Sequence, residues 1–230
     1  MTEQPAPIIH TIAIVGGTGK EGKGLAYRWA RAGYHLIIGS RQLEKAQAAA
    51  IQISDLLGGQ GEVEGMENPQ AARAGDLVVI TVPFSAHQPT LEGLVDELHG
   101  KLVIDVTVPL VPPRVSRVQM PPAGSAAQEA QQILGPETRV IAAFQNISYE
   151  HLLHDEPVEC DVLVCGGDKA ARGLVVNLIR DMGLVAFDAG PIENAVVVEG
   201  LTSVLIGINK QYGIQSAGIR ITGIPRQDGN

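Results

Sequence analysis

The feature that most constrains this chain is a β-branched run followed at once by a cluster of glycines. Residues 11–22 are TIAIVGGTGKEG, and an amphipathic stretch from Lys20 to Ala32 then ends at Gly33. A G-x-G-x-x-G pattern between a strand and a helix is typical of dinucleotide-binding units, because glycines permit a tight turn, close approach of a diphosphate and close helix packing. The N–H groups at the helix start then receive the anion. We predict a dinucleotide-binding loop formed by Gly17, Thr18, Gly19, Lys20, Glu21 and Gly22.

Apolar runs and amphipathic stretches alternate along the rest of the chain. Expected strands lie at 35–39, 76–83, 101–109, 139–144, 160–166 and 184–190. Expected helices lie at 42–57, 84–98, 168–182 and 193–212, and another begins at a capping box of Ser125 and Gln128. Because continuous apolar strands alternate with helices, we predict an α/β fold of the Rossmann type, a doubly wound parallel sheet covered on both faces. A smaller C-terminal α/β domain over 151–230 follows and ends in a long apolar helix.

The end of the second expected strand indicates which dinucleotide is bound. About 20 residues beyond the glycine loop, where the ribose 2′ group should lie, the chain has Ser40 and Arg41 in place of an acidic residue. A carboxylate there would repel a 2′-phosphate, whereas Arg41 offers it a planar fork and Ser40 a hydroxyl donor. Lys45, one helical turn further, can reach the same phosphate, with a solvated surface charge as the alternative. The pattern predicts NADP(H), bound by a Rossmann domain over 1–150.

Composition and charge exclude several other classes of protein. The net charge of −8 argues against a general nucleic-acid binder, and the N-terminal residues lack the basic segment and the long apolar run of a secretory or membrane signal. Cys160 and Cys165 are separated by an odd offset, which points them to opposite faces of a strand, so we expect no disulfide. No metal-ligand spacing occurs around either cysteine. We expect a cytoplasmic protein with no metal and no nucleic-acid or membrane partner.

The sequence alone does not reveal what accepts or donates the hydride. A carbonyl reductase must protonate the substrate oxygen as the hydride arrives. The chain has no Y-x-x-x-K motif, and its 6 histidines are scattered without triad or ligand spacing. His87, which follows the strand at 76–83 on the cofactor side, is the best catalytic candidate among them. A dinucleotide fold by itself does not decide between substrates.

Several separate motifs, in order along the chain, resemble NADPH-dependent reductases of the deazaflavin coenzyme F420. They are GGTGKEGKGLAYRWARAGYHLIIGSRQLEKA, DVTVPL, GSAAQEAQ, AAFQNIS, CDVLVCGGD and DAGPIENAVVVEGLTSVLIGIN. The resemblance implies an oxidoreductase that moves a hydride directly and reversibly between C4 of the nicotinamide of NADP(H) and C5 of coenzyme F420. Alignment of the two rings can lower the activation barrier of hydride transfer by up to ~7–11 kcal/mol, so the resemblance implies no catalytic side chain.

The resemblance also places cofactor contacts on this chain. The corresponding residues are Thr18, Gly19, Lys20, Glu21, Ser40, Arg41 and Lys45 for NADP, Val82, Pro83 and Ala86 for the nicotinamide side, Gln145 and Asn146 for both rings, and Thr202 for the deazaflavin. Gln145 departs from the family, whose members commonly have histidine there, and Val196 stands where some relatives have arginine. Arg114 and Arg117 are candidates for the acidic tail of the coenzyme, with solvated loop charges as the alternative.

Two other functions stay open at this point. An NADPH-dependent reductase of a small carbonyl or imine would place a lysine or aspartate in the cleft, and Lys210 is the late-helix candidate for that role. A non-catalytic NADP-sensing protein would carry a partner-binding surface in place of a second planar ligand. For the enzymatic function, the apolar helix at 193–212 predicts a homodimer.

Overall fold

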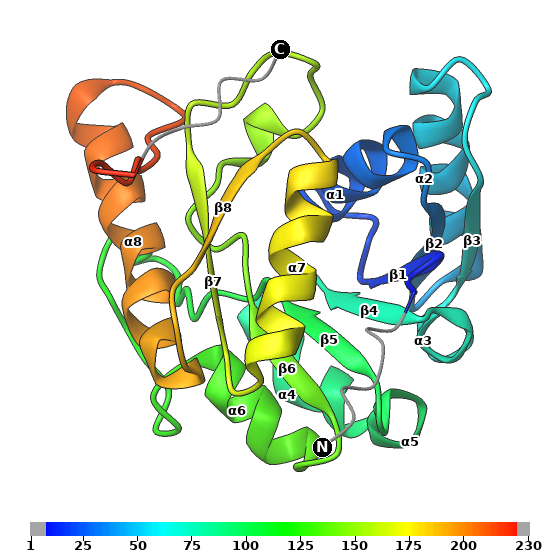
Figure 1. Ribbon diagram of the computed structural model, residues 1–230, viewed down its shortest axis with the longest axis horizontal. Helices are drawn as coiled ribbons and strands as arrows, with labels where there is room; N and C mark the ends of the chain where they lie inside the picture. Colours follow the sequence, from blue (N-terminus) through cyan, green and yellow to red (C-terminus); the bar gives the residue numbers. More distant parts are fainter. Residues whose placement is uncertain (1–7, 225–230) are drawn as a thin grey trace.

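One sheet of eight strands, in the order β3-β2-β1-β4-β5-β6-β7-β8, runs through the protein in this computed structural model (Figure 1). The structure describes residues 8–224. The strands are β1 (Thr11–Val15), β2 (His35–Ser40), β3 (Val63–Glu67), β4 (Leu77–Ile80), β5 (Leu102–Asp105), β6 (Arg139–Ala142), β7 (Asp161–Gly166) and β8 (Val185–Asp188). The helices are α1 (Lys20–Arg31), α2 (Leu43–Leu56), α3 (Asn68–Ala74), α4 (Phe84–Glu92), α5 (Val95–Leu98), α6 (Ala126–Leu134), α7 (Lys169–Asp181) and α8 (Ala195–Tyr212), with 3-10 turns η1 (Tyr149–His151) and η2 (Ile192–Asn194).

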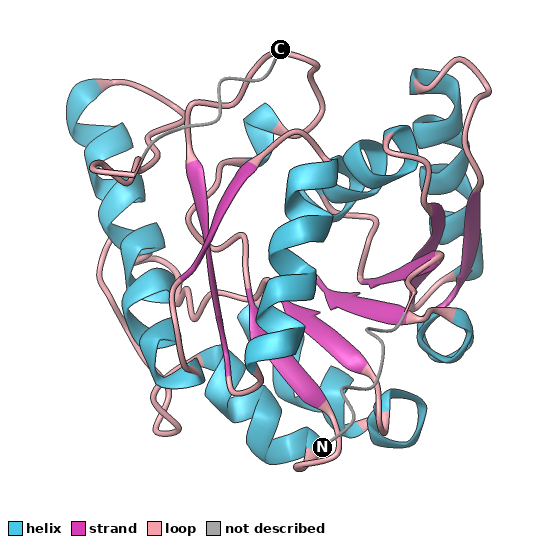
Figure 2. Ribbon diagram, viewed as in Figure 1, coloured by secondary structure: helices cyan, strands magenta, loops and turns pink. Residues whose placement is uncertain are grey.

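Helices cover both faces of the sheet, as the continuous apolar strands predicted (Figure 2). Alternate residues of β1 enter two different cores. Ile12 and Ile14 pack with residues of α1, α2 and α7, whereas Ala13 and Val15 pack with residues of α3 to α6 and of α8. The first six strands in the sheet order, β3-β2-β1-β4-β5-β6, are all parallel to one another. The carboxyl ends of β1, β2, β4 and β5 therefore lie at the same edge of the sheet. The predicted Rossmann-type α/β class is confirmed.

The C-terminal part continues the same sheet in the reverse direction. β7 pairs antiparallel with β6, with Ala142 opposite Cys165, and β8 runs parallel to β7. α7 lies across the sheet and α8 stands beside β7 at its far side (Figure 1). The strand–helix–strand pattern and the long final helix were both predicted from the sequence. Because the sheet is continuous, the division at residue 150 stays a prediction.

A buried arginine ties the two parts of the chain together. Arg28 of α1 is 6% exposed and donates to the main-chain carbonyls of His151 (2.7 Å) and Leu152 (3.1 Å), and also to that of His154. Leu152 also packs on α1, since a Cβ added at Gly24 would lie 2.5 Å from the Cβ of Leu152. The segment between β6 and β7 is thus fixed on the first helix.

Three features of the fold differ from the sequence expectation. β3 was not predicted; it is an edge strand whose residues are only partly buried, so it lacks an apolar run. The short helix α3 was not predicted either. The helix expected at 84–98 is divided into α4 and α5, which are separated by Gly93 and Leu94. Cys160 and Cys165 are buried and free, as their spacing predicted.

The final helix is unusually apolar. By length and composition, Ile192–Tyr212 could cross a membrane, with a mean hydropathy of 1.3 and 33% of its apolar window buried. Core helices of soluble proteins pass the same test, so this is weak evidence. The expected absence of a membrane partner stays a prediction.

Candidate active site

The glycine loop joins β1 to α1, and its first and last glycines are held by close contacts. The N–H of Gly17 lies 3.2 Å from the carbonyl of Ile14 and 3.0 Å from that of Gly39, which ties the loop to β1 and β2. A Cβ added at Gly22 would lie 2.6 Å from the Cα of Gly17, so α1 can pack this closely only without side chains there. A Cβ added at Gly19 would meet no heavy atom within 4 Å. The loop is therefore open to a ligand above Gly19.

The first turn of α1 offers free N–H groups beside this opening. Gly19 is the N-cap and no side chain caps the helix. The N–H of Lys23 bonds to Gly19 O at 3.0 Å, and the preceding N–H groups of the first turn have no intrahelical acceptor. Together with the positive end of the helix dipole, these groups favour an anion such as a diphosphate.

The end of β2 presents cationic groups beside the loop. Ser40 is buried, and its Oγ accepts from the N–H of Gln42 at 3.2 Å, which leaves the hydroxyl proton free to donate. Arg41 and Lys45 are exposed, and within residues 8–224 neither side chain forms an ion pair or a hydrogen bond. α2 begins at Leu43 with no side-chain cap. Two uncommitted cations and a hydroxyl donor therefore surround a helix start, which suits a phosphate group.

The residues after β4 pack against the glycine loop. A Cβ added at Gly16 would lie 2.6 Å from Val82 Cγ1, so Val82 covers the start of the loop. Thr107 Oγ1 donates to Val82 O at 3.5 Å from the end of the neighbouring strand. Pro83 is exposed and caps α4, and Ala86 is half-buried in the first turn of that helix. These residues form an apolar wall next to the loop.

The turn after β6 holds Gln145 in a strained segment. Phe144 has a φ of 78°, which costs a non-glycine residue about 1–3 kcal/mol and is most common at functional sites. Its buried ring meets Trp29 of α1 edge-on, with centroids 5.6 Å apart and planes at 89°. Gln145 Nε2 donates to Asp105 O at 2.7 Å, and its main-chain carbonyl accepts from Thr202 Oγ1 at 2.5 Å. The turn is thus joined to β5 and α8, with Gln145 between them.

Asn146 is used differently from its neighbour. Its Nδ2 donates to Asp161 O at 2.6 Å, and its Oδ1 accepts from the N–H of Leu163 at 3.4 Å. The side chain therefore fixes the turn to β7. Its expected contact with the nicotinamide and deazaflavin stays a prediction.

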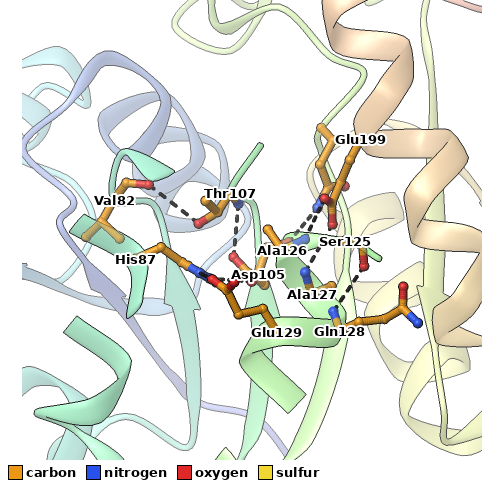
Figure 3. Close-up of polar contacts among 11 residues, drawn as sticks. Val82, His87, Asp105, Thr107, Ser125, Ala126, Ala127, Gln128, Glu129 and Glu199 are labelled. Carbon is orange, nitrogen blue, oxygen red and sulfur yellow. Dashed lines mark hydrogen bonds and ion pairs between the residues drawn. The ribbon is translucent and has the colours of Figure 1, made fainter. Parts of the chain in front are cut away.

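His87 lies in a buried cluster of charges (Figure 3). It is 0% exposed, with Nε2 2.8 Å from Asp105 Oδ2 and Nδ1 3.4 Å from Glu129 Oε1. Burial opposes the charged imidazolium, but the two carboxylates outweigh this effect and raise the pKa of His87. Asp105 Oδ1 also accepts from the N–H of Thr107 at 3.0 Å. Because both of its nitrogens are committed to carboxylates, His87 braces the strand ends and has no free nitrogen to offer a substrate.

Glu199 reaches from α8 to the start of α6 (Figure 3). It is 0% exposed and accepts from the N–H groups of Ala126 (2.7 Å) and Ala127 (3.1 Å). Burial raises the pKa of Glu199 to about 8, although the two N–H donors act in the opposite direction. Ser125 Oγ accepts from the N–H of Gln128 at 3.0 Å, which forms the predicted helix cap. α8 is therefore anchored to the sheet edge that carries the site.

The other residues considered from the sequence are exposed. Lys210 is exposed near the end of α8, eight residues (210 − 202) and about 12 Å along the helix from Thr202. Arg114 and Arg117 are exposed in the loop that precedes α6. That loop packs on α8, where Arg117 O accepts from Ser203 Oγ at 3.2 Å. Within the described residues, no three His, Cys, Asp or Glu side chains are arranged to hold a metal ion.

Sequence reasoning missed the acidic residues that support the site. Asp105 and Glu199 are single carboxylates inside the apolar runs LVIDVTV and VVVEGLTSV. A lone charge in a run that is otherwise buried is the signal that could have found them, since buried charges are normally paired. The sequence could not predict that Asp105 and Glu199 lie near His87, because the three residues come from β5, α8 and α4.

Two buried oxygens near the turn and the loop still lack a partner. Glu21 Oε1 and Gln145 Oε1 are inaccessible and have no hydrogen bond to any described residue. An unpaired buried polar group costs about 1–3 kcal/mol, which favours a ligand that supplies the missing bonds. Together with the open space above Gly19 and the free cations at Arg41 and Lys45, these atoms fit a phosphorylated dinucleotide.

Comparison with known proteins places the chain in a family. The family model for NADP oxidoreductase, coenzyme F420-dependent, matches residues 11–109. The F420-dependent NADP reductase of Methanocaldococcus jannaschii is 40% identical over 93% of this chain and 98% of the relative, and that of Methanothermobacter thermautotrophicus is 41% identical over 96% and 98%. A candidate F420-dependent NADP-reductase from Arthrobacter sp. FB24 has a crystal structure with the same fold, at a TM-score of 0.76, with 24% identity and coverage of 94% of this chain and 100% of that one. The chain therefore belongs to the family of F420-dependent NADP reductases, as its motifs suggested.

Proposed function

We propose that this protein transfers a hydride directly and reversibly between NADP(H) and coenzyme F420. The observation that carries the proposal is the meeting of three elements at one sheet edge: the open glycine loop, the Ser40-Arg41 end of β2, and the turn at 144–146. Gly17 N–H bonds to Gly39 O at 3.0 Å, which joins the loop to β2. Because β6 is parallel to β1, β2, β4 and β5, the turn that follows it leaves the sheet at the same edge. The names of the curated relatives support the same activity.

The proposed NADP(H) contacts are made by N–H groups, a hydroxyl and cationic side chains that donate no hydrogen bond and form no ion pair within the described part of the protein, and by the apolar side chains next to them. The free N–H groups of α1 bind the diphosphate, with Gly19 allowing close approach. Ser40, Arg41 and Lys45 bind the 2′-phosphate, which adds two negative charges that NAD lacks. Val82, Pro83 and Ala86 form the apolar wall behind the nicotinamide.

The remaining residues align the second ring. NADP(H) carries the hydride at C4 of its nicotinamide when bound. Gln145 Oε1, which lacks a partner, accepts an N–H of a ring amide and so fixes ring orientation. Thr202 holds the Gln145 carbonyl at 2.5 Å and thereby sets the position of the turn. Orientation and exclusion of water then supply the rate acceleration, without a catalytic side chain that bonds to substrate.

Isotope transfer tests this activity directly. Purified protein, NADPH and oxidised coenzyme F420 are mixed, and the visible absorbance of the deazaflavin is followed. NADPH deuterated separately at each face of C4 is then used, and coenzyme F420 is examined by mass spectrometry. We expect bleaching, with deuterium retained in the product from one face only. No bleaching, or complete loss of deuterium to water from both forms, would contradict direct transfer.

A homodimer formed through α8 is part of the proposal. Val197 and Val204 are 64% and 48% exposed on this helix, and exposed apolar side chains that lie together on a protein surface are typical of interaction sites. Sedimentation should give about twice the mass of one chain, whereas a clean monomer would refute the dimer. A cytoplasmic location stays a prediction. The lack of nucleic-acid partners also stays a prediction, which the net charge of −8 supports.

A further inference from the structure

Gln145 is held by two different elements of the fold. Its side-chain Nε2 donates to Asp105 O of β5 at 2.7 Å, and its main-chain carbonyl accepts from Thr202 Oγ1 of α8 at 2.5 Å. Because a main-chain carbonyl can only accept, the amide nitrogen must face Asp105, and Oε1 is the free end of the amide. Gln145 is 3% exposed, and its Oε1 is inaccessible and has no hydrogen bond to any residue of 8–224. The direction of Oε1 is therefore set by the relative positions of β5 and α8.

The end of β5 is fixed to α6 through a buried histidine (Figure 3). His87 is 0% exposed, and its Nε2 lies 2.8 Å from Asp105 Oδ2. Its Nδ1 lies 3.4 Å from Oε1 of Glu129, which belongs to the first turn of α6. Through His87, the residue that accepts from the Gln145 amide is thus tied to the start of α6.

Glu199 fixes α8 to the same turn of α6 (Figure 3). Its two oxygens accept from the N–H groups of Ala126 at 2.7 Å and Ala127 at 3.1 Å. N–H groups in the first turn of a helix have no intrahelical acceptor, so Glu199 satisfies donors that would otherwise be buried without a partner. Thr202 follows Glu199 by three residues, so the two side chains are neighbours on one side of α8.

These contacts close into a circuit of buried polar groups. Its members, in order, are Gln145, Asp105, His87, Glu129, Glu199 and Thr202, and its two arms both end on the first turn of α6. A displacement of α8 relative to α6 moves the main-chain carbonyl of Gln145, whereas the side-chain amide stays with Asp105. The displacement therefore turns Oε1. Glu199 opposes it at a point one helical turn from Thr202.

We propose that Glu199 is a positioning residue for hydride transfer, which holds α8 on α6 so that Thr202 keeps Gln145 Oε1 directed at the ring amide. This inference rests on the proposed function. Glu199 acts only through Thr202 and Gln145 in this role. A misplacement of about 1 Å can lower a reaction rate by ~10²-fold, so loss of Glu199 should act on the transfer step. NADPH affinity should change little, because it depends on the glycine loop and on Arg41.

A set of variants separates positioning from packing. Glu199→Met keeps the length of the side chain and removes both oxygens, and Glu199→Gln keeps one acceptor. Thr202→Val keeps the shape and removes the hydroxyl, and Glu199→Met is also combined with Thr202→Val. Glu62→Gln is a control at an exposed glutamate. For each protein, the single-turnover rate of deazaflavin reduction and the NADPH affinity are measured at one pH, and thermal unfolding confirms that the variant is folded.

The side-chain amide of Gln145 gives a second readout that needs no turnover. In ¹⁵N-labelled protein without ligand, its Nε2 signal is identified as the amide signal that is missing in Gln145→Glu. Because this amide is buried and bonded to Asp105, its protons should exchange slowly with solvent. A shift of α8 should change both the chemical shift and the exchange rate of this signal.

The proposal predicts a graded and non-additive pattern. Glu199→Met and Thr202→Val should each lower the transfer rate by ~10- to 100-fold and keep NADPH affinity within about threefold. Glu199→Gln should lie between the wild type and Glu199→Met, and Glu62→Gln should match the wild type. The double variant should be within about threefold of the slower single variant, because the circuit is already open in each of them. The Gln145 amide signal should change in both single variants.

Other results would overturn the role of Glu199. A wild-type transfer rate in Glu199→Met would do so, and so would rate losses that multiply in the double variant, because Glu199 would then act independently of Thr202. If Glu199→Met does not fold, Glu199→Gln takes its place in the same comparison. A Gln145 amide signal that is unchanged in the variants of an active enzyme would refute the circuit alone. A wild-type protein that never reduces coenzyme F420 would refute the proposed function and the role of Glu199 in it, whatever the amide signal does.

Discussion

Replacing Glu199 with glutamine is expected to make the protein less sensitive to alkaline pH. Glu199 is fully buried, where burial raises its pKa from the ordinary 4.5 to about 8. The folded protein therefore binds this proton more tightly than the unfolded chain does. Its stability must fall as pH rises from about 4.5 to about 8, because the unfolded chain releases the proton first. Ala126 and Ala127 donate to different oxygens of Glu199, so glutamine can accept from only one of them, a cost that does not depend on pH, and it has no proton to lose.

The size of the effect follows from the pKa. A difference of about 3.5 pH units, at about 1.36 kcal/mol each, gives about 5 kcal/mol across the whole window. Between about pH 5 and pH 7.5, the free energy of unfolding of the wild type should fall by about 3 kcal/mol relative to Glu199→Gln. His87 and Glu21 also titrate, but both proteins contain them, so their contributions largely cancel in the difference.

Chemical denaturation across this pH range measures the prediction. Wild type, Glu199→Gln and the exposed control Glu62→Gln are unfolded in urea at each pH, and the free energies are compared. The gap between wild type and Glu199→Gln should widen in favour of the variant as pH rises, and Glu62→Gln should follow the wild type. Parallel curves for wild type and Glu199→Gln would refute the argument, since Glu199 would then have the same pKa in both states.

Three further changes test the site. Arg41→Ala should raise the NADPH KM by about 10- to 100-fold and change the NADH KM little, because a charge-assisted bond to the 2′-phosphate is lost; equal changes in both would contradict the assignment. Gly22→Ala should destabilise the protein by several kcal/mol, of the order of ~3, because its Cβ would press on the backbone of Gly17, and thermal unfolding measures this. Gly19→Ala should leave the unfolding temperature unchanged, because the added Cβ meets no atom of the protein, and should weaken NADPH binding, because the Cβ would occupy space that the ligand needs. Titration measures the binding, and unchanged affinity would place the ligand elsewhere.

The main sheet could be predicted because its strands have a strong signal. β1, β4 and β5 are buried on both faces and are apolar apart from Thr11 and Asp105 at the strand ends. β3 (Val63–Glu67) was missed because an edge strand has little to bury, and its Gly65 breaks the pattern. That glycine is a packing requirement, since a Cβ there would lie 2.3 Å from the backbone nitrogen of Gln47 on α2. Contacts of this kind are set in three dimensions and leave no periodic mark.

The candidate site shows a similar division. The glycine loop and Arg41 follow from local spacing, because the chemistry of a dinucleotide fixes their distance along the chain. The bond between Thr202 and Gln145 joins residues 57 positions apart, and family resemblance alone pointed to both. The bracing of His87 by Asp105 and Glu129 could not be predicted, because sequence spacing does not show which buried charges meet.

The reversed direction of β7 determines where the protein can accept foreign residues. Because β7 runs opposite to β6, the turn at Gly167 lies at the edge away from the glycine loop, and nothing lies within 4 Å of a Cβ added there. A short tag or a reporter peptide grafted at this exposed turn would stay clear of the bound cofactor, whereas the same graft after β4 or β6 would obstruct it. The carboxyl edge of the parallel strands thus carries the candidate site, whereas the opposite edge of the sheet can be labelled.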